Sequence, residues 1–256
     1  MSKQLDFAVD LAKTAGEVIR DNLHIGTKRK WKEDHTPVTA VDTKINALVL
    51  ESIHREYPAH SILAEEGSDL GRSKEYVWVC DPLDGTFPFM HGIPVSTFTL
   101  ALVRDGEPVL GVVYDPFMDR LFCAESGRGS TLNQTSIHTR KTATLSRESV
   151  GVVFWKGNET VFGPLVAKIA GAGATVYNLV SVAYMDALVA SGELAAVVFP
   201  GQSAHDSAAV KILVEEAGGT FTSIAGGDQR YDQKVNGHIA ACSEAIHKEI
   251  LSFLSL

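Results

Sequence analysis

The chain has 256 residues, of which 45% are hydrophobic and 21% are charged, and its formal net charge is −8. A chain of this length and composition can bury a self-sufficient hydrophobic core, organised as one large domain or as two fused halves. The negative charge disfavours nucleic acid as a partner, because no basic run is longer than Lys28-Arg29-Lys30. An anionic substrate would therefore need bound cations to reverse the local charge.

Cysteine spacing and the N-terminal sequence indicate the compartment. The chain has three cysteines, which lie far apart without a CxxC pair: Cys80, Cys123 and Cys242. An odd number at such spacing predicts buried thiols in a reducing environment rather than disulfides. The first ten residues, MSKQLDFAVD, carry charges where a secretory signal would be apolar. The apolar runs are also too short and too interrupted to span a bilayer. We expect a cytoplasmic protein with no membrane association.

Two amphipathic helices are predicted near the N-terminus. Helical spacing of apolar side chains predicts the first, which is built on Leu5, Val9, Ala12, Ala15, Ile19 and Leu23. The second is predicted to begin at Asp42 and to end near Tyr57-Pro58, since proline cannot continue a helix.

Short apolar runs separated by turns follow the second helix. They cover residues 61–64, 76–80, 96–103, 108–114 and 120–124. The turns between them contain glycine or aspartate, as in Arg104-Asp105-Gly106-Glu107. This pattern predicts an antiparallel sheet.

From about Ser146, strand and helix patterns alternate. Strands are predicted at residues 150–155, 174–178, 194–199, 220–222 and 238–241, and helices at residues 162–170, 181–190, 206–217 and 244–254. Neither an internal repeat nor a flexible linker is present. We expect a single α+β domain of two fused halves, about 1–145 and about 146–256, in which helices cover sheets.

The strongest chemical signal lies in the segment Val79-Cys80-Asp81-Pro82-Leu83-Asp84-Gly85-Thr86. An apolar strand delivers Asp81 at its end, and Pro82 forces a turn that can bring Asp84 to the same side. Gly85 allows close backbone approach, so that the following N–H groups would point at an anion. Two such carboxylates repel unless a cation lies between them, and Mg²⁺ prefers oxygen ligands. A solvated surface turn is the alternative that this segment alone leaves open.

Three further acidic residues stand in similar surroundings. Glu65 ends an apolar strand and is followed by Glu66-Gly67. Asp206 and Asp42 each stand at the predicted start of a helix, where a carboxylate could equally serve as a helix cap. Taken together, these positions predict a cluster of carboxylates.

The motifs together resemble the inositol monophosphatase family of metal-dependent, lithium-sensitive sugar and polyol phosphatases. In the family's order they are Pro37-Val38-Thr39-x-x-Asp42, Ile62-Leu63-Ala64-Glu65-Glu66, Asp81-Pro82-Leu83-Asp84-Gly85-Thr86, Asp206-Ser207-Ala208-Ala209 and Glu215-Glu216-Ala217-Gly218-Gly219. The resemblance implies a layered αβαβα fold and a homodimer.

The resemblance also implies which residues hold metal. Two to three Mg²⁺ ions would be bound, with Asp42 assisting Glu65 at a weaker third site. Asp81 would be shared between the two main ions. The metal ligands would be Glu65, Asp81, the carbonyl of Leu83, Asp84 and Asp206.

The same resemblance implies the substrate contacts and the catalytic groups. Gly85 and Thr86 would bind the phosphate through their backbone, and the Thr86 hydroxyl with Asp42 would orient the attacking water. Ser181 matches a substrate-contact position, although a simple helix cap is the alternative there. The catalytic residues would be Asp42, Thr86 and Glu65, and the substrate-binding residues Asp84, Gly85, Thr86, Ser181 and Asp206.

The sequence departs from the family on the leaving-group side. Inositol phosphatases usually carry Glu seven residues before the last metal-binding Asp, where this chain has Phe199. We expect Phe199 to form an apolar wall if its ring faces the site. His205 replaces the usual Trp, Pro88 replaces the usual Asn, and Lys32 stands where the family often has a basic residue near the metals.

The sequence therefore predicts a Mg²⁺-dependent phosphomonoesterase that hydrolyses a small sugar or polyol phosphate of the inositol-1-phosphate type by direct attack of metal-activated water. Histidinol-phosphate phosphatase, fructose-1,6-bisphosphatase and the phosphatase of 3′-phosphoadenosine nucleotides share the implied metal site and stay open as alternatives. A regulatory binding protein that retains the fold is an alternative of another class.

Overall fold

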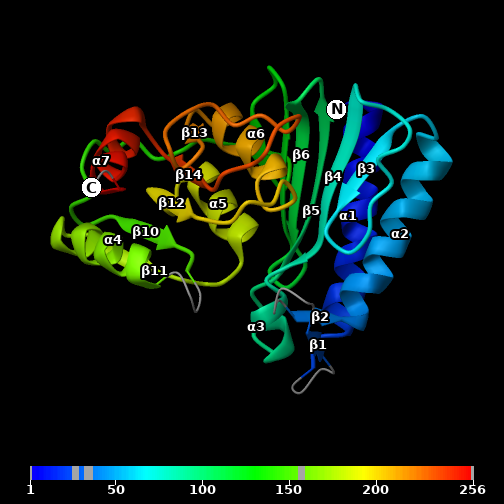
Figure 1. The fold of residues 1–256 in the computed structure, drawn as a ribbon, viewed down its shortest axis with the longest axis horizontal. Helices are drawn as coiled ribbons and strands as arrows, with labels where there is room; N and C mark the ends of the chain where they lie inside the picture. The colour runs from blue at the N-terminus through cyan, green and yellow to red at the C-terminus, as the bar shows by residue number, and fades with distance from the viewer. Residues whose placement is uncertain (1, 25–28, 32–36, 155–158, 255–256) are drawn as a thin grey trace.

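Alternating layers of helix and sheet make up the protein (Figure 1). The computed structural model describes residues 2–24, 29–31, 37–154 and 159–254. At the right of Figure 1, α1 (Lys3–Asp21) and α2 (Ala40–Glu56) cover the outer face of a seven-stranded sheet. The central layer consists of α5 (Val182–Ala190) and α6 (Ala208–Glu216). At the left, α4 (Glu159–Gly171) and α7 (Glu244–Leu254) cover the outer face of a five-stranded sheet. The αβαβα architecture implied by the family resemblance is confirmed.

Both N-terminal helices begin at side-chain caps. The Ser2 hydroxyl accepts the N–H of Leu5 at the start of α1 (3.2 Å). At the start of α2, Thr39 is the cap residue, and the Asp42 carboxylate accepts the Thr39 N–H (2.9 Å), which completes a capping box. Helix α2 therefore begins at Ala40, and the prediction that Asp42 heads it is wrong.

The first sheet carries both motifs that end in carboxylates. Its strands are, in spatial order, β3 (Ser61–Ala64), β4 (Tyr76–Asp84), β5 (Thr97–Arg104), β6 (Glu107–Asp115), β7 (Arg120–Glu125), β8 (Ser130–Leu132) and β9 (Thr135–Ile137). All neighbours are antiparallel except β3 and β4, which are parallel. The prediction of a purely antiparallel sheet is wrong at this pair. Because parallel strands end at the same edge, β3 and β4 bring Glu65 and Asp81 to one place.

Several short elements were not predicted. Besides β8 and β9, these are β1 (Arg29–Trp31) and β2 (Pro37–Thr39), which pair antiparallel, and the one-turn helix α3 (Thr86–Met90) directly after β4. Each is too short to show a hydrophobic period. Helix α3 begins inside the carboxylate motif and carries Pro88 in its first turn, where proline is tolerated.

Side chains of the first sheet alternate between two cores. On β4, Trp78 and Cys80 pack with α1 and α2, whereas Val79 packs with α5, α6 and the second sheet. All three side chains are buried. Burial on both faces explains why these strands are almost continuously apolar in the sequence.

The second sheet combines parallel and antiparallel pairs in the order β11 (Thr175–Tyr177), β10 (Ser149–Val152), β12 (Ala196–Phe199), β14 (His238–Ala241) and β13 (Thr220–Thr222). The strands predicted at 220–222 and 238–241 and the helix at 244–254 are confirmed. Trp155, in the predicted strand 150–155, lies outside the described residues. Helix α6 begins after Ser207, so the predicted helix start at Asp206 is wrong.

Among the described residues, the strands of the two sheets come from separate stretches of sequence. Those of the larger sheet end at Ile137, and those of the smaller sheet begin at Ser149. Helices α5 and α6 belong to the second stretch, yet they also pack on the first sheet and share one core with both sheets. The two halves are therefore joined through their interior.

The cysteines and helices can be compared with the sequence expectations. Cys80, Cys123 and Cys242 are free and buried, as predicted. Burial raises the pKa of the Cys123 thiol to about 12, which makes this thiol unreactive. Within the part of the chain that the structure describes, no helix is long and apolar enough to cross a membrane.

Helix α6 lies unusually close to the first sheet at Gly111 of β6. A β-carbon at Gly111 would lie 2.5 Å from the carbonyl oxygen of Ala209 and 2.7 Å from a methyl carbon of Ile212. The first of these neighbours is backbone and cannot rotate away. Only glycine therefore fits at this contact.

We predict that Gly111→Ala destabilises the protein by about 1–3 kcal/mol, the usual cost of overpacking a dense core. Urea unfolding would measure the change. The control is Gly171→Ala at the end of α4, where a β-carbon would meet no atom within 4 Å. Equal stability of Gly111→Ala and the wild type would show that α6 can move away from the sheet.

Candidate functional site

The carboxylate motif forms a bulge at the end of β4. Asp81 pairs with Thr99 of β5 and Asp84 pairs with Thr97, so the four residues 81–84 of β4 lie opposite only three residues of β5. Pro82, which has no N–H to donate to the ladder, lies in this bulge, as is usual for proline within a sheet. The Leu83 N–H donates to the Asp81 carboxylate (2.9 Å), which holds the turn. Both aspartates are buried, with 3% and 4% exposure.

Three other carboxyl groups surround Asp81. Glu65 follows β3, and its backbone N–H donates to the carbonyl of Cys80 (3.2 Å), which places it beside the end of β4. Burial, and next repulsion from Glu65, Asp84 and Asp206, raise the pKa of Asp81 well above its ordinary value. The residues predicted to bind metal through carboxylates therefore do gather in one place, from three separate segments of the chain.

Asp84 also serves as the acceptor at the N-terminus of α5. One carboxylate oxygen accepts the Val182 N–H (2.8 Å), and the other accepts the hydroxyls of Ser181 (2.6 Å) and Thr97 (3.0 Å). The N–H of Ala183 lies 3.1 Å from that second oxygen. Burial raises the pKa of Asp84 to about 6, although these hydrogen bonds act in the opposite direction.

Sequence reasoning missed the donors around Asp84. Thr97 is fully buried at the start of the mostly apolar strand β5, and Thr99 lies two residues further on the same face. Two threonines at this spacing were the only signal, and it is a weak one. Ser181 is also fully buried and gives its hydroxyl to Asp84 rather than capping α5.

Asp42 and Thr86 form a second polar pair at this edge. The Thr86 hydroxyl lies 3.0 Å from the Asp42 carboxylate and 3.0 Å from the carbonyl of Leu83. Asp42 is fully buried, and burial raises its pKa against the hydrogen bonds from Thr39 and Thr86. Its place in the capping box of α2 fixes the direction of the carboxylate. The residues predicted to orient water are thus in contact.

Gly85 connects the bulge to α3 in a conformation that favours glycine. Its φ is +84°, in the left-handed region. A β-carbon there would lie 2.7 Å from the Val95 carbonyl oxygen and 3.1 Å from the β-carbon of Ser181. Glycine is therefore needed both for the turn and for the close approach of the second half.

Phe199 does not form the apolar wall considered from the sequence. It is 5% exposed and belongs to the core shared by the two sheets. Its ring lies against Gly201, where a β-carbon would come within 2.1 Å of the ring, and 5.3 Å from the ring of His238. The ring is thus turned inward. Lys32 lies outside the described residues.

The donor chemistry of this cluster fits a hard divalent cation. Glu65, Asp81, Asp84 and Asp206 offer only oxygen atoms, and their mutual repulsion around Asp81 would be relieved by positive charge. In the described residues, no three carboxyl, imidazole or thiol groups already stand in an arrangement that encloses an ion. The Asp84 oxygen that accepts Val182 keeps lone pairs with which it could bind a cation.

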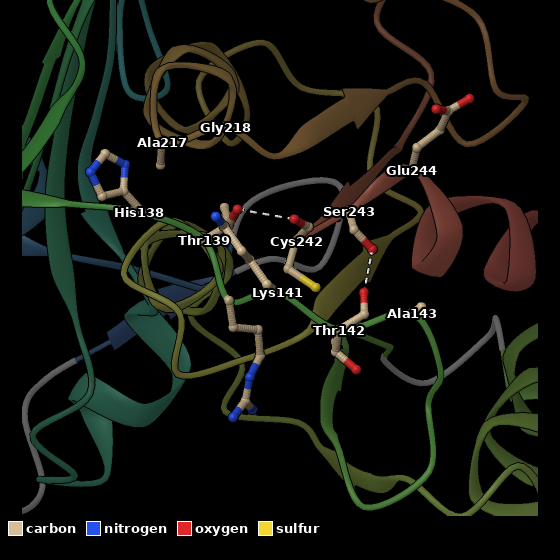
Figure 2. Close-up of a pocket in the computed structure, with 11 residues that line it drawn as sticks. His138, Thr139, Lys141, Thr142, Ala143, Ala217, Gly218, Cys242, Ser243 and Glu244 are labelled. Atoms are coloured by element: carbon tan, nitrogen blue, oxygen red, sulfur yellow. Dashed lines mark hydrogen bonds between the residues drawn. The ribbon is translucent and has the colours of Figure 1, made fainter.

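A cavity of about 780 Å³ lies elsewhere, where the segment after β9 meets the ends of α6 and β14 (Figure 2). It is lined by residues 138–143, 217, 218 and 242–244, which include none of the four clustered carboxylates. Thr139 donates to the Cys242 carbonyl (3.0 Å) and Ser243 to the Thr142 carbonyl (2.7 Å), and these bonds hold its walls together. His138 and Glu244 stand at opposite sides of it in Figure 2. No chemical constellation converges there.

Known proteins are similar to this chain over most of its length. The sequence model of the inositol monophosphatase family matches residues 1–255. The chain belongs to the inositol monophosphatase family. A Nus factor SuhB of Pseudomonas aeruginosa is 31% identical over 271 residues, which cover 98% of this chain and 96% of that protein. An inositol-1-monophosphatase of Mesorhizobium japonicum is 32% identical over 218 residues, which cover 84% and 81%.

A solved family structure agrees with the fold. The inositol monophosphatase of Thermotoga maritima superposes with a TM-score of 0.91 at 26% sequence identity, covering 99% of this chain and 97% of that one. The inositol monophosphatase family consists of metal-dependent phosphatases. Family membership therefore supports the assignment of this chain as a metal-dependent phosphatase. The carboxylate cluster is the part of the chain suited to the metal.

We predict that Thr97→Val destabilises the metal-free protein by about 1.5–3 kcal/mol at pH 7, because it removes a hydrogen bond to a buried carboxylate without changing the side-chain shape. Urea unfolding in the presence of EDTA would measure the loss. Thr43→Val on the exposed face of α2 is the control and should change stability by less than about 0.5 kcal/mol. An unchanged Thr97→Val variant would mean that Asp84 does not need this donor.

The raised pKa of Asp84 predicts how metal-free stability depends on pH. Its folded-state pKa of about 6 lies above the ordinary value of 3.8, so the folded protein holds this proton more tightly than the unfolded chain. The resulting stability is full below pH 4 and is lost as the pH rises through 6. In EDTA, the stability of the wild type relative to Asp84→Asn should therefore fall, on the order of 3 kcal/mol, between pH 4 and pH 7. A flat difference would contradict the burial of Asp84.

Proposed function

We propose that this protein is a Mg²⁺-dependent phosphomonoesterase acting on small phosphorylated metabolites. The observation that carries the proposal is the burial of Asp81 among Glu65, Asp84 and Asp206, next to the Asp42–Thr86 pair. Such a concentration of negative charge is unfavourable by itself and becomes favourable around divalent cations. Family membership supports the same chemistry.

Each residue of the cluster has a proposed role. Glu65, Asp81 and the Leu83 carbonyl would hold one Mg²⁺, and Asp81, Asp84 and Asp206 a second. Asp42 with Glu65 would assist a weaker third ion. The substrate would be contacted by Gly85 and Thr86 through their backbone, and by Asp84 and Asp206 through the second ion. Ser181, whose hydroxyl is held by Asp84, would act by fixing that carboxylate.

The reaction proposed is direct attack of water on phosphorus. When bound, Mg²⁺ supplies activation of the water and neutralises charge on the phosphoryl and leaving oxygens. Asp42 accepts a hydrogen bond from Thr86, and this pair would hold the water and take up its proton. Glu65 would assist from the other side of the cluster. No side chain needs to form a covalent bond to phosphorus.

The substrate proposed is a sugar or polyol phosphate, with inositol 1-phosphate the leading candidate. Phe199 stands where family inositol phosphatases usually carry a polyol-binding Glu, and its ring is buried. A charge-assisted hydrogen bond to a hydroxyl contributes about 1.5–3 kcal/mol, so selectivity for inositol should be modest without that Glu. Histidinol phosphate, fructose 1,6-bisphosphate and 3′-phosphoadenosine nucleotides are the alternative substrates.

A regulatory role is the second candidate function. It is favoured by the name Nus factor SuhB, which is carried by relatives at 30–32% identity over 98% of this chain. Such a role would use a protein partner and would not require turnover. Comparing a partner pull-down with turnover measurements on the same preparation would separate the two functions.

We further propose a cytoplasmic homodimer, from the buried free thiols and the family resemblance.

We predict that the purified protein hydrolyses phosphate monoesters only with added Mg²⁺. A panel of inositol 1-phosphate, a sugar phosphate, histidinol phosphate, 3′-phosphoadenosine nucleotide and an aryl phosphate should give measurable kcat/KM values, with inositol 1-phosphate preferred by less than about 100-fold. Asp84→Asn should reduce kcat by at least about 100-fold, the scale observed when one preorganised electrostatic group is lost. Release of inorganic phosphate is the measurement.

Two controls make this assay decisive. Asp10→Asn, on the exposed face of α1, should retain the full rate. Circular dichroism should establish that Asp84→Asn is folded, because its amide would face the donors at the start of α5. Undiminished turnover in excess EDTA would contradict the proposal, as would turnover by Asp84→Asn equal to that of the wild type.

A further inference from the structure

We propose that a buried Asp186–His238 pair, acting through Phe199, positions the two carboxylates Asp84 and Asp206 that would share the second Mg²⁺. This inference rests on the proposed function, because it concerns ligands of the proposed metal site. Neither Asp186 nor His238 stands in a recognised motif. Both would be positioning residues, because the side-chain contacts that the structure gives them are with each other and with the rings of Phe199 and Phe221.

The pair is completely enclosed in the second half. The His238 Nε2 lies 2.8 Å from a carboxylate oxygen of Asp186, and the two side chains are 1% and 0% exposed. The His238 ring stacks on Phe221 of β13, with ring centres 4.8 Å apart, and lies 5.3 Å from the ring of Phe199. A buried polar pair of this kind has a definite geometry, because losing either partner leaves a buried group unpaired.

One arm of the pair leads to Asp206. His238 is the first residue of β14 and faces Phe199, the last residue of β12, in the ladder. The Phe199 ring occupies the space over Gly201, where a β-carbon would come within 2.1 Å of it. The Gly201 carbonyl in turn accepts the N–H of Gly237, directly before β14 (2.8 Å). His238 and Phe199 therefore set where the chain leaves the sheet.

The segment that leaves the sheet at this point carries Asp206. Residues 200–207 connect β12 to α6 without regular structure apart from turns. The segment is held at its far end by the Thr99 hydroxyl, which lies 3.4 Å from the His205 carbonyl, and by the Ser207 N–H, which donates to the Ala204 carbonyl (3.1 Å). Its near end depends on Phe199 and Gly201. A shift of that end would move Asp206 relative to Asp81.

The other arm of the pair leads to Asp84. Asp186 lies on α5, and the first N–H groups of the same helix hold the Asp84 carboxylate. Figure 1 shows α5 in the central layer, beside β12 and β14. The Asp186–His238 contact therefore fixes α5 against the strands that deliver Phe199. This one buried contact therefore sets the distance between α5, whose first turn holds Asp84, and the 200–207 segment, which carries Asp206.

This arrangement predicts a selective effect on metal binding. The first proposed Mg²⁺ uses Glu65, Asp81 and Leu83, all of which follow β3 or lie at the end of β4. The second shares Asp81 with the first and adds Asp84 and Asp206, which depend on the pair. Disturbing the pair should weaken one ion and leave the other nearly unchanged, whereas general loosening of the second half should have no such selectivity.

Isothermal titration of Mg²⁺ into the full-length protein tests the inference without relying on turnover. Asp186→Ala and Phe199→Leu should each weaken one Mg²⁺ affinity by about tenfold, the lower end of the effect of losing a group that orients a metal ligand. Asp186→Asn retains an acceptor for His238 and should stay within about threefold of the wild type. Circular dichroism would establish folding, and if Asp186→Ala does not fold, Phe199→Leu decides.

A matched control separates positioning from stability. His247 is also buried in the second half, and its Nε2 lies 2.7 Å from the Thr222 hydroxyl, a contact that joins α7 to β13. His247→Ala should leave both Mg²⁺ affinities within about twofold, because this contact does not lead to a metal ligand. Equal weakening by His247→Ala, or wild-type affinities in Phe199→Leu, would overturn the inference alone. Absence of Mg²⁺ binding by the wild type would overturn the proposed function as well.

Discussion

The repulsion between carboxyl groups buried around Asp81 is the constraint on which the rest of the structure depends. Left to themselves, Glu65, Asp84 and Asp206 would separate from Asp81, because burial strengthens their mutual repulsion. The protein holds them together through the parallel ends of β3 and β4 and through the bulge at Pro82. Both faces of the first sheet are covered, so this edge is supported by two cores. A site of this kind stores unfavourable charge that a cation can relieve.

Asp84 shows that the two halves meet at the candidate site rather than simply flanking it. It lies in the β4 bulge of the first half, and its carboxylate receives hydrogen bonds from Ser181 and the first turn of α5 in the second half. The positive end of a helix dipole favours the ionised form, whereas burial favours the protonated form, and burial dominates in the metal-free protein. The same carboxylate therefore joins the halves structurally and would join them chemically through a shared ion.

The chain departs from the family pattern at a position expected to contact the leaving group, so family membership does not determine the substrate preference. Relatives named inositol-1-monophosphatase and Nus factor SuhB are 32% and 31% identical to this chain, so overall similarity does not distinguish their functions. Phe199, which stands where the family usually has Glu, lies in the interior, and its ring packs against Gly201 and His238. Its consequence for chemistry would therefore pass through the position of the 200–206 segment rather than through contact with a substrate.

The sequence by itself determined most helices and strands, because hydrophobic period and turn chemistry act over a few residues. Its motifs, through their resemblance to the family, also indicated which carboxylates gather. It placed Asp81 and Asp84 at the end of an apolar strand, but it missed α3, β8 and β9, which are too short to show a period. Only the tertiary structure decided that β3 runs parallel to β4, that Asp84 receives α5, and that Phe199 turns inward. These features depend on contacts between distant parts of the chain, such as Ser181 and Asp84, which are 97 residues apart. Local sequence carries no record of such a partner until packing brings the two halves together.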